Sequence, residues 1–90
     1  MNANNALVVL VVDDETQIRR FLRAGLELEG YHVHEAGSGE EGLRIGTLRA
    51  LDLIILDLAM PDLEGSEVLE RLRSWSNIPV IILDLAMPSR

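Results

Sequence analysis

The sequence predicts an α/β fold, a doubly wound parallel sheet with helices on both faces. Short apolar runs rich in branched residues alternate with amphipathic stretches over the 90 residues, and this alternation is typical of βαβ crossovers. Apolar residues make up 48% of the chain and aromatic residues only 3%, so the core consists mainly of Leu, Ile and Val. That composition suits parallel strands buried on both sides. The length allows one small domain over residues 1–90.

The first strand and helix are predicted directly after a polar start. Residues 1–6 are expected to be flexible, and Leu7–Val12 is an apolar run that ends at Asp13-Asp14. The following stretch, Gln17–Leu28, has apolar residues at helical spacing. They are Ile18, Leu22 and Leu26, with Phe21, Gly25 and Leu28 on an adjoining stripe. Gly30 is expected to terminate this helix, because glycine adopts the left-handed conformation found there.

The second strand and helix follow without a long loop. His32–Ala36 is a short strand candidate. Ser38 with Glu41 forms a capping-box pattern, which predicts the start of a helix. Gly42 and Gly46 each weaken a helix by about 1 kcal/mol relative to alanine. This helix is therefore expected to depend on packing against the rest of the domain.

A third strand, a third helix and a fourth strand complete the pattern. Leu53–Leu56 is an apolar run, and Ser66–Ser74 is a helix candidate that follows the turn around Gly65. Pro79–Leu83 is the last strand candidate, and the segment 84–90 forms an atypical tail. The expected order is strand, helix, strand, helix, strand, helix, strand.

Composition and charge exclude several classes of protein. The net charge is −7 and the isoelectric point is about 4.6, whereas a nucleic-acid surface needs clustered basic residues. No cysteine is present, so disulfides and thiolate metal sites are excluded. The longest apolar run, Ala6–Val12, is too short to cross a bilayer. The polar start does not resemble a signal peptide, so we expect a cytoplasmic protein without nucleic-acid or membrane contact.

Carboxylates follow three of the four predicted strands. Asp13 and Asp14 follow the first, Asp57 the third and Asp84 the fourth. In doubly wound sheets, ligands bind beyond the carboxyl ends of the strands, and neighbouring strands lie about 4.8 Å apart. Like charges this close favour a bound cation such as Mg²⁺, beside which a carboxylate can attack a phosphoryl group. A plainer interpretation stays open, in which Asp13-Asp14 caps the first helix and Asp57 ends a strand.

The sequence motifs around these carboxylates are together specific to one protein family. Val-Val-Asp-Asp-Glu at 11–15, Leu-Asp-Leu-Ala-Met-Pro-Asp-Leu-Glu-Gly at 56–65 and Ile-Pro-Val-Ile at 78–81 resemble bacterial two-component response-regulator receiver domains. The resemblance covers residues 7 to about 83 and looks most like the Kdp-type regulators of the winged-helix transcription-factor subfamily. It implies a flavodoxin-like sheet, truncated after the fourth strand.

The resemblance assigns a role to each acidic residue. Asp57 matches the phosphoacceptor, and Asp14 with Asp57 matches the side-chain ligands of Mg²⁺. Asp13 acts through a metal-bound water, and Ala59 contributes its backbone carbonyl to the metal. The implied reaction takes phosphate from the phosphohistidine of a sensor histidine kinase, so the domain modifies its own Asp and is not an enzyme with a separate substrate. Haloacid-dehalogenase-type phosphatases also use an Asp after a strand, but they carry a second Asp where this chain has Ala59.

The end of the chain departs from the family pattern. A receiver has five βα units, and this chain supplies three and a half, so the lysine of the fifth strand is missing. Asp84 stands where the family has Ser or Thr. Ile81–Pro88 also repeats Ile54–Pro61 without change over eight residues, which favours duplication, recombination or deliberate engineering. We therefore expect impaired phosphorylation and impaired switching.

A chain that stops after the fourth strand is expected to expose that strand as a sheet edge. Exposed apolar edges pair with other chains. The sequence thus predicts a homo-oligomer, most simply a dimer joined through the fourth strand or by exchanged elements. A second hypothesis follows, in which the chain is a receiver-derived fragment whose main property is folding and self-association.

Two further groups of residues have alternative interpretations. His32 and His34 lie on one side of the second strand, but without a third ligand they are better explained as polar residues of an edge strand. The first helix carries a basic stripe made of Arg19, Arg20 and Arg23. In receivers this helix contributes to the contact with the kinase. A solvent-exposed face, with the arginines paired to Glu27, is equally compatible with the pattern.

Overall fold

The structure is a computed structural model that describes residues 6–63 and 65–83. Residues 1–5 of the predicted flexible start at 1–6 lie outside the described residues, as do the tail at 84–90 and Asp84 within it. Seven elements follow in the expected order: β1 Val8–Val12, α1 Thr16–Leu28, β2 His32–Ala36, α2 Gly39–Leu48, β3 Leu53–Asp57, α3 Gly65–Arg73 and β4 Val80–Leu83. The predicted bounds of the strands, of α1 and of α3 agree with these to within one residue.

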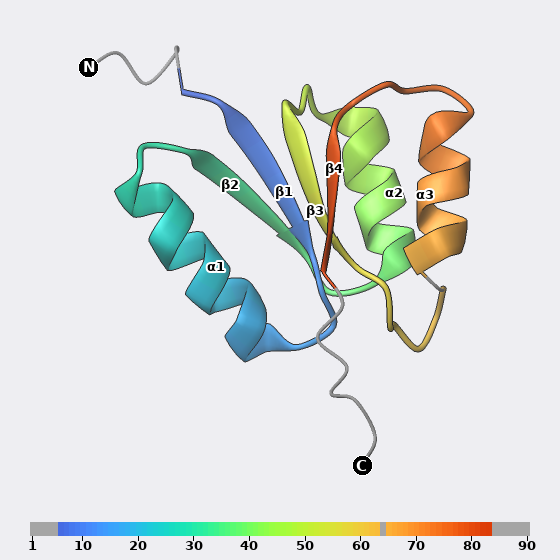
Figure 1. The fold of residues 1–90 in the computed structure, drawn as a ribbon, viewed down its shortest axis with the longest axis horizontal. Helices are drawn as coiled ribbons and strands as arrows, with labels where there is room; N and C mark the ends of the chain where they lie inside the picture. Colours follow the sequence, from blue (N-terminus) through green and yellow to red (C-terminus); the bar gives the residue numbers. More distant parts are fainter. Residues whose placement is uncertain (1–5, 64, 84–90) are drawn as a thin grey trace.

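The strands form one parallel sheet in the order β2-β1-β3-β4. Helix α1 lies on one face of this sheet, and α2 and α3 lie together on the other (Figure 1). This is the doubly wound α/β arrangement that the sequence predicts. Because β1 and β3 are neighbours, their carboxyl ends meet at the same rim of the sheet.

An apolar layer fills each side of the sheet. On the side of α2 and α3, the buried residues include Leu10, Ile54, Leu56, Val68 and Leu72. The layer under α1 is smaller and consists of Val9, Val11, Val33 and Ile55, with Leu22 and Leu26 of α1 packed against it. The central strands β1 and β3 are therefore buried on both faces, as their continuous apolar runs indicate, whereas β2 and β4 are only partly buried.

Helix α1 covers its face of the sheet loosely. No residue of α1 is fully buried, and Phe21 and Leu28, predicted to extend its apolar stripe, are exposed. That part of the prediction is wrong, because in the described residues the layer under α1 is too narrow to reach them. The helix ends as expected: Gly30 has a φ of 93°, and its N–H donates to the Glu27 carbonyl at 3.0 Å.

None of the described helices is long and apolar enough to cross a membrane.

Helix α2 starts at the predicted cap. The Ser38 hydroxyl accepts a hydrogen bond from the Glu41 N–H at 3.1 Å, and the Glu41 carboxylate accepts one from the Gly37 N–H at 2.8 Å. The glycines that weaken this helix have a packing reason. A Cβ added at Gly42 would lie 3.0 Å from Cγ2 of Val12 in β1. The absence of that Cβ lets α2 approach the sheet closely.

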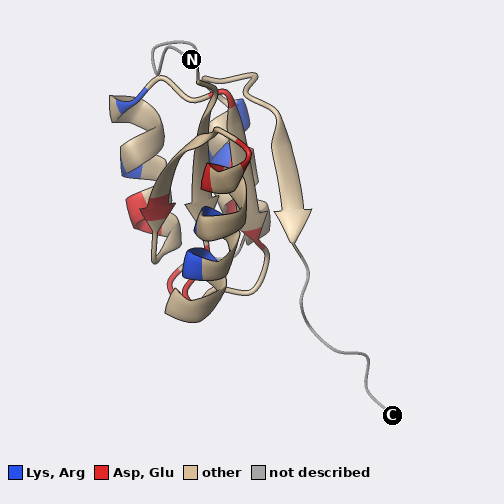
Figure 2. Ribbon diagram, turned by 90° about the vertical axis from the view of Figure 1, so that its left-hand side faces the viewer, with Lys and Arg blue, Asp and Glu red and all other residues tan. Residues whose placement is uncertain are grey.

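The repeated sequence forms strands in two different surroundings. Ile54–Leu56 lies within β3, and Ile81–Leu83 lies within β4. The register pairs Ile55 with Ile81, so the two copies are offset by one residue. An offset of one residue moves each side chain to the opposite face of a sheet. The isoleucines of β3 are at most 7% exposed, whereas those of β4 are 50% and 38% exposed, because β4 is the outermost strand (Figure 2).

Candidate functional site

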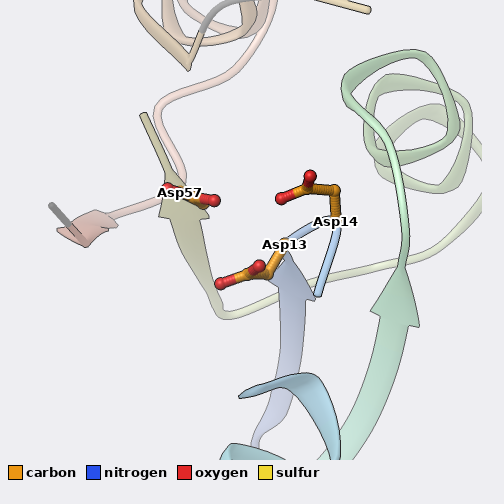
Figure 3. A group of neighbouring side chains, drawn as sticks. All are labelled: Asp13, Asp14 and Asp57. Atoms are coloured by element: carbon orange, nitrogen blue, oxygen red, sulfur yellow. The ribbon is translucent and has the colours of Figure 1, made fainter. Parts of the chain in front are cut away.

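Three carboxylates meet at the rim where β1 and β3 end. Asp13 and Asp14 follow β1 directly, and Asp57 is the last residue of β3. One oxygen from each of them lies within 4.8 Å of the other two. Figure 3 shows the three side chains directed toward a common space. The predicted cluster is therefore confirmed for these residues, and among the described residues it is the one group with the composition of a metal site.

The three carboxylates differ in burial and in hydrogen bonding. Asp13 and Asp57 are only 1% and 7% exposed, whereas Asp14 is exposed. The Glu15 N–H donates to Oδ1 of Asp13 at 2.8 Å, and the Ala59 N–H donates to Oδ1 of Asp57 at 3.1 Å. The other oxygen of Asp13, Oδ2, is buried without a hydrogen-bond partner in the described part of the chain.

The surroundings of Asp13 are those of a cation ligand. Burial raises the pKa of its carboxyl above the usual 3.8, the Glu15 N–H opposes this, and the charges of Asp57, Asp14 and Glu15 add to the increase. A buried oxygen without a donor costs free energy unless something binds it. Mg²⁺ is a hard ion that takes oxygen ligands and keeps several waters. The donor set and the unpartnered Oδ2 therefore fit this ion.

Asp13 and Asp14 do not act as a simple helix cap. The N-terminal cap residue of α1 is Glu15, and its side chain makes no capping hydrogen bond. The carboxylate of Asp13 accepts from the N–H of Glu15 itself, which closes a local turn before the helix. The plainer interpretation of this acidic pair thus leaves Oδ2 of Asp13 and the whole Asp14 carboxylate unexplained.

The loop after Asp57 returns tightly to the end of β3. The Gly65 N–H donates to the Leu58 carbonyl at 2.9 Å. A Cβ added at Gly65 would lie 2.5 Å from Cα of Leu58 and 2.6 Å from the carbonyl oxygen of Asp57. Both neighbours are backbone atoms that cannot rotate away, so close approach explains the glycine at this position. Met60 and Leu63 anchor the same loop in the core.

A further carboxylate of this loop was missed by the sequence reasoning. Asp62 accepts hydrogen bonds from the N–H groups of Gly39 and Glu40, both at 3.1 Å. These bonds, from Gly39 first, lower the pKa of Asp62. They tie the loop that follows Asp57 to the first turn of α2. No local pattern marks this contact, because the partners lie more than 20 residues apart in sequence.

The histidines and the basic stripe stand apart from the carboxylate cluster. The rings of His32 and His34 meet edge to face, with centroids 5.3 Å apart, and the metal-type cluster found in the described residues does not include them. Arg23 pairs with Glu27 at 2.9 Å and with Glu35 at 3.0 Å, so the predicted pairing to Glu27 is confirmed. Figure 2 shows arginines along α1 with acidic residues beside them.

Comparisons with known proteins agree with the fold and show the family. The chain matches the response regulator receiver domain over residues 9–89. It is 52% identical over 75 residues to the KDP operon transcriptional regulatory protein KdpE of Escherichia coli, covering 83% of this chain and 33% of that protein. It is 45% identical over 83 residues to the transcriptional regulatory protein ResD of Bacillus subtilis, covering 92% of this chain and 35% of that protein. The chain thus spans about a third of the length of these relatives.

Solved structures show the same architecture. The response regulator TrrA of Thermotoga maritima, solved in complex with Mg(2+)-BeF, superposes with a TM-score of 0.85 at 38% identity, covering 89% of this chain and 70% of that one. The chemotaxis response regulator CheY4 of Vibrio cholerae superposes with a TM-score of 0.87 at 31% identity, covering 93% and 72%. The parallel sheet, the rim of carboxylates and the match over residues 9–89 establish that this chain belongs to the response-regulator receiver domain family.

Proposed function

We propose that this chain is the phosphoacceptor of a two-component phosphorelay and that Asp57 receives the phosphoryl group. The observation that carries the proposal is the cluster of Asp13, Asp14 and Asp57, whose ligand oxygens lie within 4.8 Å of one another with Oδ2 of Asp13 buried and unpartnered. A buried group of like charges is unfavourable in isolation and becomes favourable around a cation and a phosphoryl group. The donor, by resemblance, is the phosphohistidine of a sensor histidine kinase, and we propose that this chain accepts the phosphoryl group in the cytoplasm.

In the proposed reaction Asp57 is the nucleophile. A carboxylate oxygen of Asp57 forms a bond to phosphorus while the bond from phosphorus to the histidine nitrogen breaks, and that nitrogen keeps the bonding electron pair. The Ala59 N–H holds Oδ1 of Asp57 at 3.1 Å, which orients the carboxylate before the reaction. The absence of a Cβ at Gly65 lets the loop after Asp57 return close to the end of β3. The protein modifies its own side chain, so no separate substrate is turned over.

The same residues provide the proposed Mg²⁺ site. Asp14 and Asp57 would bind the ion directly, Asp13 through a water molecule, and Ala59 through its backbone carbonyl. When bound, Mg²⁺ neutralises the carboxylates and the phosphoryl oxygens. The similarity to TrrA, which was solved with Mg(2+)-BeF, supports this assignment. The 90 residues contain no lysine that would share this charge, so we expect phosphorylation to be slower than in receivers that have one.

Binding of beryllofluoride, a phosphoryl mimic, tests the proposal directly. We expect saturable Mg²⁺ binding by calorimetry or NMR, and a beryllofluoride response that appears only when Mg²⁺ is present. Asp57→Asn removes the nucleophilic oxygen and its charge, so the beryllofluoride response is lost. Glu70→Gln is a matched control, because it makes the same change of charge at an exposed position of α3. A wild-type chain without a response, or a response that survives in Asp57→Asn, would contradict the proposal.

We also propose that the 90-residue chain forms a homodimer through β4. The strand Val80–Leu83 carries no charged residue, and Ile81 is half-exposed, so no charge on this edge strand opposes pairing with a second copy. Light scattering over a range of concentrations should show a dimer that Ile81→Lys converts to a monomer. Leu28→Lys places the same charge on an exposed apolar residue of α1 and should leave the dimer intact. A compact monomer at every concentration would exclude this assembly.

A further inference from the structure

Arg19 is held by three acceptors beside the carboxylate cluster. Its Nη1 donates to the backbone carbonyl of Asp13 at 2.7 Å, and its Nε donates to Oε1 of Glu35 at 3.0 Å. Its Nη2 lies 3.3 Å from Oγ1 of Thr16. The side chain is only 16% exposed, unlike that of Arg20, which is exposed. Arg19 is therefore partly buried against the turn at Asp13 and is not a free member of the basic stripe.

The contact between Arg19 and Asp13 completes a set of hydrogen bonds that fixes the backbone of Asp13. We call this set the clamp. The N–H of Asp13 donates to the Ala36 carbonyl of β2 at 3.0 Å, and its carbonyl accepts from Arg19. Both backbone groups of Asp13 thus have fixed partners, and Oδ1 is held in addition by the Glu15 N–H. These three hydrogen bonds fix the orientation of the Asp13 carboxylate. Because Asp14 is the next residue in the chain, they also restrict its position.

Arg19 bonds to the backbone of Asp13, and within residues 6–63 and 65–83 no ion pair joins it to the three carboxylates of the cluster. Its guanidinium bonds the Asp13 carbonyl and Glu35, whereas Oδ2 of Asp13 has no partner in the described part of the chain. Glu35 balances the charge of Arg19 and fixes its orientation from β2. The negative charge of the rim therefore stays available for a cation.

We propose that Arg19, anchored by Glu35, is a positioning residue that holds the Asp13-Asp14 turn in the geometry that binds the cation. The inference rests on the proposed function, because it assigns Arg19 a role at the same metal site. Arginine suits this role because its planar fork can bridge a carbonyl and a carboxylate at once, whereas lysine offers a single charged nitrogen. Gly37 leaves room for the fork, since a Cβ added there would lie 3.2 Å from Nη1 of Arg19.

A role of Arg19 through its charge and a role through positioning predict opposite effects of its removal on the affinity for Mg²⁺. Removal of a positive charge near the rim would tighten Mg²⁺ binding, because one repulsion with the cation disappears. Loss of the clamp would weaken it, and substitutions of residues that orient metal ligands typically reduce affinity by about 10–100-fold. The direction of the change therefore separates a positioning role from a general electrostatic effect.

The test compares Arg19→Met with Arg20→Met, which removes the same charge one position along α1 at an exposed site. We expect Mg²⁺ to bind about tenfold or more weakly to Arg19→Met and with unchanged or slightly higher affinity to Arg20→Met. Arg19→Lys keeps the charge but replaces the planar fork by a single ammonium nitrogen, which cannot reproduce the separate bonds from Nε and Nη1, so this variant should also bind Mg²⁺ more weakly than wild type. Urea unfolding of each variant confirms that the titrations are made on folded protein.

A second measurement does not require the metal. In metal-free protein, the Glu15 amide is protected by its bond to Oδ1 of Asp13. We expect its hydrogen exchange to be at least about tenfold faster in Arg19→Met, while the amide of Leu10 within β1 keeps its wild-type rate. Equal exchange at Glu15, with Mg²⁺ affinity as high as in Arg20→Met, would overturn the role of Arg19. A wild-type chain that fails to bind Mg²⁺ would instead overturn the proposed function, and the exchange measurement would still decide whether Arg19 holds the turn.

Discussion

Asn in place of Asp13 should make the metal-free protein more stable and at the same time remove its cation site. Asp13 is buried between two other carboxylates, and its Oδ2 has no donor in the described residues. Asp13→Asn keeps the size of the side chain and an oxygen that can accept from the Glu15 N–H. It removes the negative charge, and with it the repulsion from Asp14 and Asp57.

The expected gain follows from the separation of the charges. At 4.8 Å, the upper limit for the ligand oxygens, two unit charges repel by about 3.5 kcal/mol at an effective dielectric constant of 20 and by about 0.9 kcal/mol in water. The pair of Asp13 and Asp57 is buried, whereas Asp14 is exposed. After the cost of burying a new amide, we expect the free energy of unfolding to rise by about 2 kcal/mol. Asp14→Asn should gain less than about 1 kcal/mol, because water screens its charge.

Urea denaturation at pH 7.5 with a chelator measures these differences, and a thermal scan should show an increase of about 10 °C for Asp13→Asn. Added Mg²⁺ should then stabilise the wild type by about 2.7 kcal/mol at 100 times its dissociation constant and stabilise Asp13→Asn much less. The reasoning would be refuted if Asp13→Asn were no more stable than the wild type without metal. It would also be refuted if Asp14→Asn gained more than Asp13→Asn.

Other substitutions and pH give further expected outcomes. Gly65→Ala should destabilise the fold by about 1–3 kcal/mol, because its Cβ would meet backbone atoms, whereas Gly25→Ala, with nothing within 4 Å, should stabilise it by about 0.5–1 kcal/mol; urea midpoints decide both. Asp62→Ala should speed the hydrogen exchange of the two α2 amides that it caps, without changing exchange in β1. Burial raises the pKa of Asp13 above 3.8, so its folded carboxyl binds a proton more tightly than the unfolded chain. Its contribution to metal-free stability is therefore complete below pH 3.8 and lost as the pH rises through the raised value, and the difference in urea midpoint between wild type and Asp13→Asn should follow this dependence.

The fold could be predicted closely from the sequence because β1, β3 and β4 each contain a continuous apolar run. Val8–Val12 ends at an acidic pair and Leu53–Asp57 at a loop with Pro and Gly, so the bounds are marked by residue type. The packing of α1 was less predictable. Helical spacing places Phe21 beside the buried stripe, but how far the sheet extends beneath it depends on tertiary structure and is not encoded locally.

The candidate site was predictable to the extent that it depends on strand ends. Asp13, Asp14 and Asp57 follow strands that the βαβ rule places side by side, so their convergence could be inferred. The contacts of Arg19 and Asp62 could not, because their partners lie on other elements far along the chain. The sequence of a basic stripe on a helix does not distinguish arginines that face solvent from one that hydrogen-bonds to a neighbouring turn.

The identity of the two copies of the repeated sequence has a consequence for how this chain folds. In the unfolded chain, two identical eight-residue segments, 54–61 and 81–88, compete for the place beside β1. The second copy lies less than twice as far from β1 along the chain as the first, so loop closure separates them by less than about 0.6 kcal/mol. Side-chain chemistry cannot separate them at all. The choice is therefore made by the connections, the crossover through α2 above all, and refolding carries a built-in competitor of its central strand.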